Sequence, residues 1–249
     1  MKSLSQFAVG VVLQLSLFLT TPFPAQHKPA PLQVDLPNGL ALDSQGNLYI
    51  SDIGTHRILK RTKAGRLSVI AGTGEVGFSG DGGPAIKAHL HAPHDLLFDI
   101  DGNLIIADTG NQRIRKIDRN GIISTIAGDG KSLQSNYNGK VPDTSLNNPQ
   151  SLALDLEGNL FIADTYNHVI RKLDRAGKLT IFAGTVGGHG GDGGLATAAQ
   201  MNLPMAVTVG PDGSVYVSDA GNSRIRQITP DGKIKTIVGF GPAADTYGG

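Results

Sequence analysis

The stretch ADTGNQRIRKID, residues 107–118, decides the fold, because related stretches recur along the chain. The others are SDIGTHRILKRT at 51–62, ADTYNHVIRKLD at 163–174 and SDAGNSRIRQIT at 218–229. Each has an aspartate at its second position, namely Asp52, Asp108, Asp164 and Asp219, and follows a proline, namely Pro37, Pro93, Pro149 and Pro204. Both residues recur at intervals of about 56 residues, so the chain contains four tandem units.

Each unit contains four short segments in which apolar and polar residues alternate. In the first unit these are NGLALD (38–43), NLYISD (47–52), RILKRT (57–62) and LSVIAG (67–72). Alternation with a turn signal about every ten residues predicts four antiparallel strands. Glycines at the turns, such as Gly46 and Gly65, allow the positive φ that short hairpins need.

A four-stranded sheet of this size is marginal alone, because it buries only part of its apolar surface. Stacking around a common axis covers both faces and protects the strand edges, as in a β-propeller. The sequence therefore predicts an all-β fold, a β-propeller of four-stranded antiparallel blades. The propeller domain spans 37–249, with units at about 37–92, 93–148, 149–203 and 204–249.

The four quoted stretches resemble NHL repeats. The linkers EVGFSGDGGPAIKAHLHAP (75–93) and VGGHGGDGGLATAAQMNLP (186–204) are similar to those of bacterial and teneurin-type NHL arrays. This resemblance covers about Leu36 to Val238 and implies a propeller, a fold that hosts many unrelated activities. NHL propellers usually have more than four blades, and the first unit here is degenerate, with Thr55 and Arg61 in place of an asparagine and an aliphatic residue. The units therefore form a small ring, leave an open arc, or belong to a larger propeller.

Composition agrees with many short strands joined by tight turns. The 249 residues include 34 Gly and 13 Pro, and only 5% are aromatic. The formal net charge of +1 provides no global field for binding nucleic acid or an anionic membrane. The absence of cysteine excludes disulfides, thiolate metal sites and a cysteine nucleophile.

The N-terminus has the layout of a secretory signal peptide. Lys2 precedes an apolar run from Phe7 to Thr20, and a small residue follows at Ala25. The run is short and interrupted by Gln14, which disfavours a membrane-spanning helix. We expect a signal peptide over 1–25 with cleavage near Ala25, a linker over 26–36, and a secreted or periplasmic protein without membrane attachment. An uncleaved anchor is the alternative.

The four repeated aspartates end the second strand of each unit. Because they occur in every unit, a structural role explains them better than catalysis does. We expect each to cap its own turn by accepting backbone N–H bonds, facing an arginine at Arg57, Arg113 or Arg224. A ring of carboxylates that holds Ca²⁺ is the alternative.

The third strands carry basic residues, at Arg115, Lys116, Arg171, Lys172 and Arg226. We interpret them as a solvated strand face paired with Asp118 or Asp174. Contact with acidic glycans or phosphates is the alternative.

The segment HLHAPHD is the candidate for a special site, because no other linker repeats it. It places His89, His91 and His94 within a short stretch. Neutral imidazoles bind Zn²⁺ or a similar metal, so these residues are the candidate metal ligands, with ordinary surface histidines as the alternative.

The linker from Asp129 to Leu146 diverges most from the others. Divergent loops on a repeated scaffold carry binding specificity, so Lys131, Tyr137 and Lys140 mark a candidate binding loop. The glycines of SGDGGPA (79–85) and GGDGGLA (190–196) are interpreted as turns between blades; backbone groups open to an ion are the alternative.

A binding or scaffold module for a protein or glycan outside the cytoplasm accounts best for these features. It needs no catalytic group and no cofactor, and the sequence contains no nucleophile elbow, phosphate loop or paired-carboxylate pattern. One alternative is a metal-dependent propeller enzyme of the lactonase or lyase kind, with Ca²⁺ or Zn²⁺ near a central channel. Another is a piece of a longer NHL array, which would self-associate if its ring is incomplete.

Overall fold

The computed structural model describes residues 32–132 and 145–239. Contacts divide the chain into Met1–Pro31 and a unit over Leu32–Gly249, and all described residues belong to the second unit. The predicted signal peptide, Tyr137 and Lys140 lie outside the described residues.

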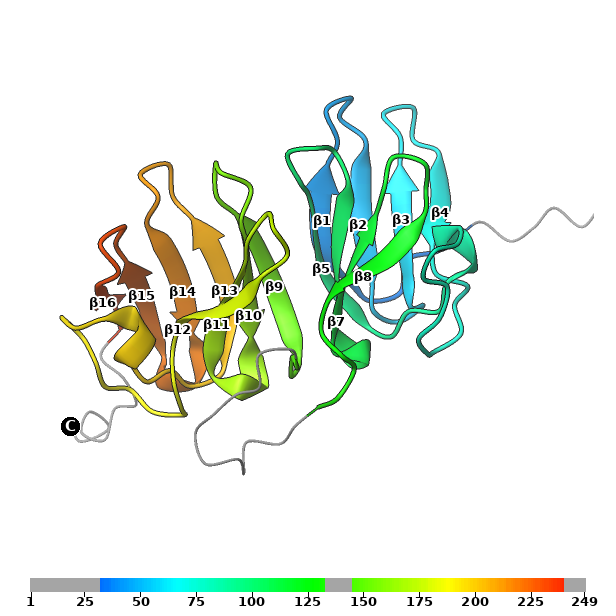
Figure 1. Cartoon of the computed structure of the whole chain (residues 1–249). Helices are drawn as coiled ribbons and strands as arrows, with labels where there is room; N and C mark the ends of the chain where they lie inside the picture. The colour runs from blue at the N-terminus through cyan, green and yellow to red at the C-terminus, as the bar shows by residue number, and fades with distance from the viewer. Residues whose placement is uncertain (1–31, 133–144, 240–249) are drawn as a thin grey trace, which may run out of the picture. The chain divides into compact units, whose positions relative to one another are not determined.

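The described residues form four sheets of four strands, which we call blades 1 to 4 (Figure 1). Blade 1 contains β1 (Pro37–Leu42), β2 (Leu48–Asp52), β3 (Arg57–Arg61) and β4 (Leu67–Ala71). Blade 2 contains β5 (Pro93–Phe98), β6 (Leu104–Asp108), β7 (Arg113–Ile117) and β8 (Ile123–Ala127). Blade 3 contains β9 (Pro149–Leu154), β10 (Leu160–Asp164), β11 (Val169–Leu173) and β12 (Leu179–Ala183). Blade 4 contains β13 (Pro204–Val209), β14 (Val215–Asp219), β15 (Arg224–Ile228) and β16 (Ile234–Val238).

Within each blade every strand pairs antiparallel with the next strand along the chain. The predicted all-β fold with four-stranded antiparallel blades is therefore confirmed. The predicted turn glycines adopt positive φ, 78° at Gly46 and 84° at Gly65, where the short hairpins turn.

Five single turns of 3-10 helix, which the alternation of residues did not predict, lie between strands. Three of them follow the repeated aspartate in blades 2 to 4: η2 (Thr109–Asn111), η3 (Thr165–Asn167) and η5 (Ala220–Asn222). The other two, η1 (Ala85–Lys87) and η4 (Ala196–Ala198), lie in the linkers. Within residues 32–132 and 145–239, no helix is long and apolar enough to cross a membrane.

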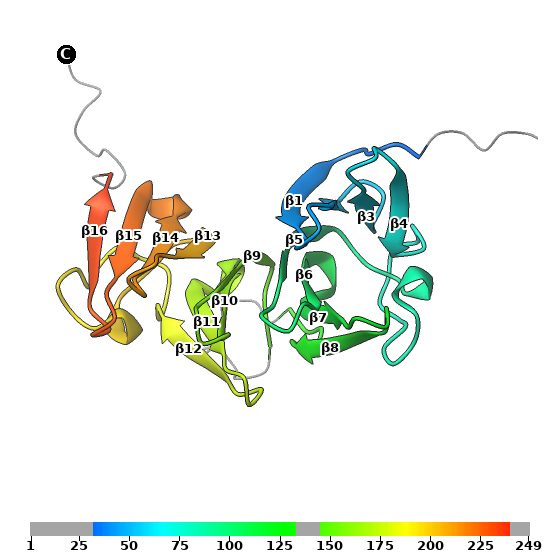
Figure 2. The same cartoon turned by 90° about the horizontal axis from the view of Figure 1, so that it is seen from above.

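Three apolar clusters join consecutive blades. Blades 1 and 2 share a cluster that includes Ile58 and Leu96, and β1 lies beside β5 (Figure 2). Blades 2 and 3 share a second cluster around Ile114 and Ile162, and blades 3 and 4 share a third. No apolar cluster of the described residues joins blade 1 to blade 4.

The linker that precedes a blade lies along the outer strand of that blade. Gly82 N–H donates to the carbonyl of Ile123 at 2.8 Å, and Ile123 N–H donates back to Gly83 at 3.0 Å. Gly193, Gly194 and Ile234 make the same pair of bonds in blade 4, at 2.8 and 3.0 Å. The linkers therefore cover the outer edges of blades 2 and 4, which would otherwise expose unpaired backbone groups.

Candidate functional site

Each repeated aspartate is fully buried and binds the segment that precedes its blade. One carboxylate oxygen of Asp108 accepts the backbone N–H of His91 at 2.8 Å, and the other accepts the Asn111 side-chain amide at 2.8 Å. The same two bonds recur in blades 3 and 4. Asp164 accepts the backbone N–H of Asn147 and the side-chain amide of Asn167, and Asp219 accepts those of Asn202 and Asn222. The aspartates therefore fasten each linker to the following blade, whereas the sequence predicted caps on their own turns.

In blades 2 to 4 the charged partner of the aspartate is an arginine that the sequence predicted to lie on a solvated strand face. Arg115 Nη1 lies 3.0 Å from Asp108 Oδ2, and neither side chain is exposed. Arg171 pairs with Asp164 at 3.0 Å and Arg226 with Asp219 at 3.3 Å. The solvated interpretation of these three arginines was wrong, because they lie on the buried side of the strand, as Arg115 does opposite Ile106.

The same arginines hold the glycine-rich linkers. Arg115 Nη2 lies 2.8 Å from Asp81, and Arg226 Nη2 lies 2.8 Å from Asp192, both within the repeated GDGG sequence. Burial raises the pKa of the Asp108 carboxyl, and the bonds from Asn111 and Arg115 oppose that effect. Aspartate, arginine and linker thus form one structural network per blade.

Arg57, Arg113 and Arg224 face the repeated aspartates in the strand ladder, but their guanidinium groups bind loop carbonyls. Arg57 donates to Thr73 at 2.7 Å, Arg113 to Asp129 at 2.9 Å, and Arg224 to His189 at 3.0 Å. Arg57 and Arg113 therefore fix the start of the linker that follows their blade, whereas Arg224 binds within the linker that precedes its blade.

Blade 1 departs from this network, as its degenerate sequence indicates. Leu59 occupies the position of the buried arginines and is itself completely buried. Asp52 accepts the N–H of Leu36 at 2.8 Å and the hydroxyl of Thr55 at 2.7 Å. Burial disfavours its charge, but these hydrogen bonds hold the pKa of Asp52 below its usual range.

The three candidate metal-binding histidines make separate contacts. His89 Nε2 lies 3.5 Å from Glu75, and the His91 ring packs edge-on against His56 with centroids 5.7 Å apart. His94 is half-buried, and burial lowers the pKa of its imidazole. Among the described residues no group of three His, Asp or Glu side chains is arranged to hold a metal ion, so a metal at these histidines stays a prediction. Of the candidate binding loop, Lys131 is exposed at the last described positions before residue 133.

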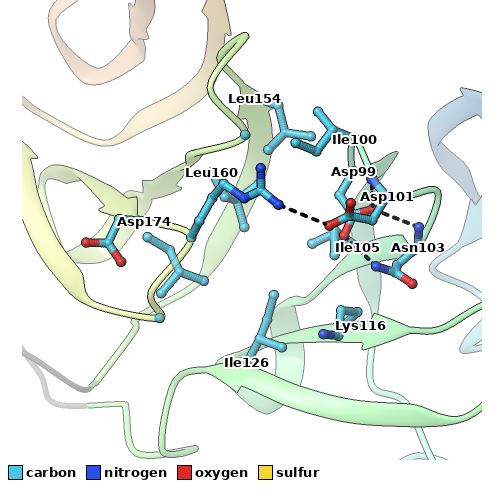
Figure 3. Close-up of a pocket in the computed structure, with 14 residues that line it drawn as sticks. Asp99, Ile100, Asp101, Asn103, Ile105, Lys116, Ile126, Leu154, Leu160 and Asp174 are labelled. Atoms are coloured by element: carbon cyan, nitrogen blue, oxygen red, sulfur yellow. Dashed lines mark hydrogen bonds and ion pairs between the residues drawn. The ribbon is translucent and has the colours of Figure 1, made fainter.

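The site that the structure brings together is a pocket of about 340 Å³ between blades 2 and 3 (Figure 3). Its floor is aliphatic, and its rim carries charged turn residues. The aliphatic residues are Ile100, Ile105, Ile126, Leu154, Leu160 and Leu173. Asp101 from blade 2 and Arg175 from blade 3 form an exposed ion pair at 3.6 Å on the rim.

The pocket exists because blade 2 lacks aromatic residues at positions where the neighbouring interfaces have them. Between blades 1 and 2, Tyr49 packs edge-on against Phe98 at 4.9 Å between ring centroids. Towards blade 4, Phe161 packs against Phe182 at 4.8 Å. The equivalents in blade 2 are Ile105 for Tyr49 and Phe161, and Ile126 for Phe182, and these smaller side chains leave space.

Lys116 lines this pocket and differs from the lysines at the same position in blades 1 and 3. Lys60 Nζ lies 3.2 Å from Asp43 and 4.9 Å from the Tyr49 ring centroid. Lys172 Nζ lies 3.8 Å from Asp155 and 5.4 Å from the Phe161 ring centroid. Within the described part of the chain, Lys116 has neither an ion pair nor an aromatic partner. The backbone hydrogen bond from Ile122 lowers the pKa of Asp118, and the charge of Lys116 adds to this effect.

The sequence analysis missed this pocket, although its signal is present in the repeat. Aligning the units places Tyr49, Ile105 and Phe161 in one column, and the loss of the ring in blade 2 marks the interface that is left hollow. Residues shared between units and unusual histidines do not reveal the pocket, because it follows from the different sizes of equivalent apolar residues.

Comparison with known proteins supports the assignment of the repeats. The family model for the Teneurin NHL domain matches residues 39–138. Teneurin-3 of Mus musculus is 28% identical over 234 residues, which cover 80% of this chain and 8% of that protein. Teneurin-m of Drosophila melanogaster is 29% identical over 222 residues, which cover 78% of this chain and 8% of that protein. The chain therefore spans less than a tenth of the length of these curated relatives.

Solved propeller structures share the fold at low sequence identity. A streptogramin B lyase matches 86% of this chain and 58% of its own with a TM-score of 0.59 and 14% identity. An auxiliary nutrient binding protein from Bacteroides thetaiotaomicron matches 80% of this chain and 48% of its own, with a TM-score of 0.59 and 18% identity. These likenesses concern the blade architecture, which both longer chains continue. Repeats, blades and family match agree: the described units fold as propeller blades, and the chain is similar to the NHL domain of teneurins.

Proposed function

We propose that this chain is an exported binding module that holds an acidic segment of a protein partner in the pocket between blades 2 and 3. The observation that carries the proposal is Lys116, whose ammonium group lies beside an aliphatic floor without the carboxylate and aromatic ring that accompany Lys60 and Lys172.

The chemistry of the pocket selects the ligand class. An aliphatic floor favours a short apolar side chain. Asp99, Asp101 and Asp174 also line the pocket, so it favours a ligand carboxylate only where that carboxylate lies against the ammonium group of Lys116, which has no ion-pair partner among the described residues. A peptide in which a leucine adjoins an acidic residue offers both groups. A sugar acid offers the carboxylate, but its hydroxyls would have few polar partners on the aliphatic floor, so we propose a protein rather than a glycan.

The export part of the proposal depends on the N-terminal sequence alone, Lys2 and the apolar run up to Thr20.

A matched set of variants tests the pocket. Purified protein is titrated with acetyl-Leu-Glu-amide and with its neutral counterpart acetyl-Leu-Gln-amide, and binding is followed by NMR chemical shifts. We expect the charged peptide to bind about fivefold more tightly, since a partly exposed ion pair contributes about 1 kcal/mol. Lys116→Gln should remove this difference, and Lys172→Gln, which changes the paired lysine of blade 3, should preserve it.

A variant in which the pocket is filled provides the second part of this test. Ile105→Tyr introduces the residue that blade 1 has at the same position, so the fold should accept it while the space is lost. We expect neither peptide to bind this variant. Equal binding of both peptides to the unaltered protein, or binding that persists after Ile105→Tyr, would contradict the proposal.

A further inference from the structure

Every blade interface in this chain is built from the same two faces. The forward face is the side of a blade that packs on the next blade, and in blade 1 it includes Tyr49, Ile58 and Ala71. The rear face is the side that receives the preceding blade, and in blade 2 it includes Leu96 and Phe98. The equivalent residues meet again between blades 2 and 3 and between blades 3 and 4.

Blade 4 carries a forward face on which no described residue of another blade packs. Val238 is 61% exposed, whereas its equivalents Ala71 and Ala183 in blades 1 and 3 have no exposure. Ile237 beside it is 42% exposed. This face keeps the apolar character of the covered ones, and β16 even has a larger side chain at the position of the buried alanines.

The rear face of blade 1 is also apolar and exposed. Leu40 is 61% exposed, whereas its equivalents Leu96, Leu152 and Val207 in blades 2 to 4 are between 2% and 6% exposed. Leu42 is 66% exposed, and its equivalents Phe98, Leu154 and Val209 are partly buried against a cluster. Large exposed apolar sheet faces of this kind mark interaction surfaces.

The rear face of blade 1 also differs from the other rear faces, because it does not need an aspartate from a preceding linker. In blades 2 and 4 the buried arginine requires the aspartate of the preceding linker, as Arg115 does with Asp81. Leu59 stands at that position in blade 1 and is completely buried without any counter-charge. Because Leu59 is already covered within the chain, a partner would contact the exposed Leu40 and Leu42 and need not supply a counter-charge.

We infer that blade 4 of one copy of this chain packs its forward face on the rear face of blade 1 in a second copy. The new interface would continue the one that the chain repeats between its own blades, with Val238 and Ile237 on one side and Leu40 and Leu42 on the other. Each copy offers one face of each kind, so two copies can cover all four exposed faces at once.

The experiment measures mass in solution by sedimentation velocity on the purified full chain over a range of concentrations. We expect a dimer, which Leu40→Lys and Val238→Lys each weaken by about thirtyfold or more, because either change buries an unpaired charge in the interface. Leu156→Lys is the control: Leu156 is 86% exposed, lies in a turn of blade 3 and belongs to neither face, so this variant should remain dimeric.

Mixing the two weakened variants tests the head-to-tail arrangement. The Leu40→Lys copy keeps an intact blade 4 and the Val238→Lys copy keeps an intact blade 1, so an equal mixture should form a one-to-one complex through the single intact interface. Because both changes are at exposed positions, circular dichroism should show unaltered folding. A monomeric unaltered chain, a dimer that resists both substitutions, or a mixture that stays monomeric overturns the inference and assigns the two faces to a different partner, such as further blades of a longer chain.

Discussion

Arg115, Arg171 and Arg226 are charged side chains with no exposed surface, and each is matched by one buried aspartate. A buried charge is tolerated only when it is paired and hydrogen-bonded, so these pairs tie the sequence motif to the fold. The recurrence of the aspartate predicted a structural role, and the bonds from Asp108, Asp164 and Asp219 to the preceding linkers agree with such a role. The face of the basic residues was predicted wrongly, because neighbours such as Arg115 and Lys116 point to opposite faces of the strand, and the sequence does not say which face is buried.

Replacing one buried arginine should therefore destabilise the chain strongly. We expect Arg115→Leu to lower the free energy of unfolding by about 3 kcal/mol, because Asp108 is left buried without its counter-charge. Urea denaturation followed by circular dichroism measures the loss. Arg175→Leu removes an exposed pair with Asp101 and should change stability by about 0.5 kcal/mol or less. Similar losses of unfolding free energy in the two variants would show that the buried pair contributes no more to stability than the exposed pair.

At the scale of strands and linkers, the alternation of residues predicted all sixteen described strands to within about two residues. The short 3-10 turns were not predicted, since three residues are too few to show a period. The pocket could not be located from one unit at a time, because it arises from the difference between Ile105 and the rings at Tyr49 and Phe161 in other blades.

Two histidines connect neighbouring elements through a bond that depends on protonation. His56 Nδ1 accepts the N–H of Ala92 and His168 Nδ1 accepts that of Leu203, each at 3.1 Å. At the same position in blade 2, Gln112 Oε1 accepts the N–H of Asn148. Burial lowers the pKa of both histidines, and for His56 the neighbouring His91 lowers it further. A protonated Nδ1 could not accept either bond.

We expect these histidines to make stability depend on pH. Because their folded-state pKa lies below the unfolded value of about 6.5, the unfolded chain binds more protons as pH falls. Their contribution is therefore complete above pH 6.5 or so and decreases as pH falls through the folded-state pKa. The double variant His56→Gln/His168→Gln copies Gln112, so it should keep the bonds and lose this part of the pH dependence. Parallel curves of unfolding free energy against pH for both proteins would refute the assignment, and His89→Gln serves as the control.

At the scale of the whole molecule, each blade is stabilised mainly by its neighbours in sequence, as in other repeat proteins. Whether the ring closes was left open by the sequence, because equivalent residues look alike whether or not another blade covers them. Only exposure separates Leu40 at 61% from Leu152 at 6%.

This contrast gives a matched pair of substitutions. Leu152→Ala weakens the interface between blades 2 and 3, where the pocket already reduces packing, and should lower stability by about 3 kcal/mol. The unfolding transition should also broaden or divide, as blades 1–2 separate from blades 3–4. Leu40→Ala, measured at high dilution, should change stability by about 0.5 kcal/mol or less. Thermal and urea unfolding check both, and an equally sharp transition in all three proteins would argue against neighbour-by-neighbour stability.

The hydrogen bonds between linker and outer strand bear on how such chains grow. Gly82 and Gly83 form hydrogen bonds with the outer strand of the blade that follows them. This linker and the four strands after it therefore form one structural unit. A gene duplication that copies residues 72–127 delivers a sheet with its own edge cover. One that starts at Pro93, the boundary suggested by the prolines, omits Gly82 and Gly83, so the outer strand β8 of the copied sheet would expose unpaired backbone groups.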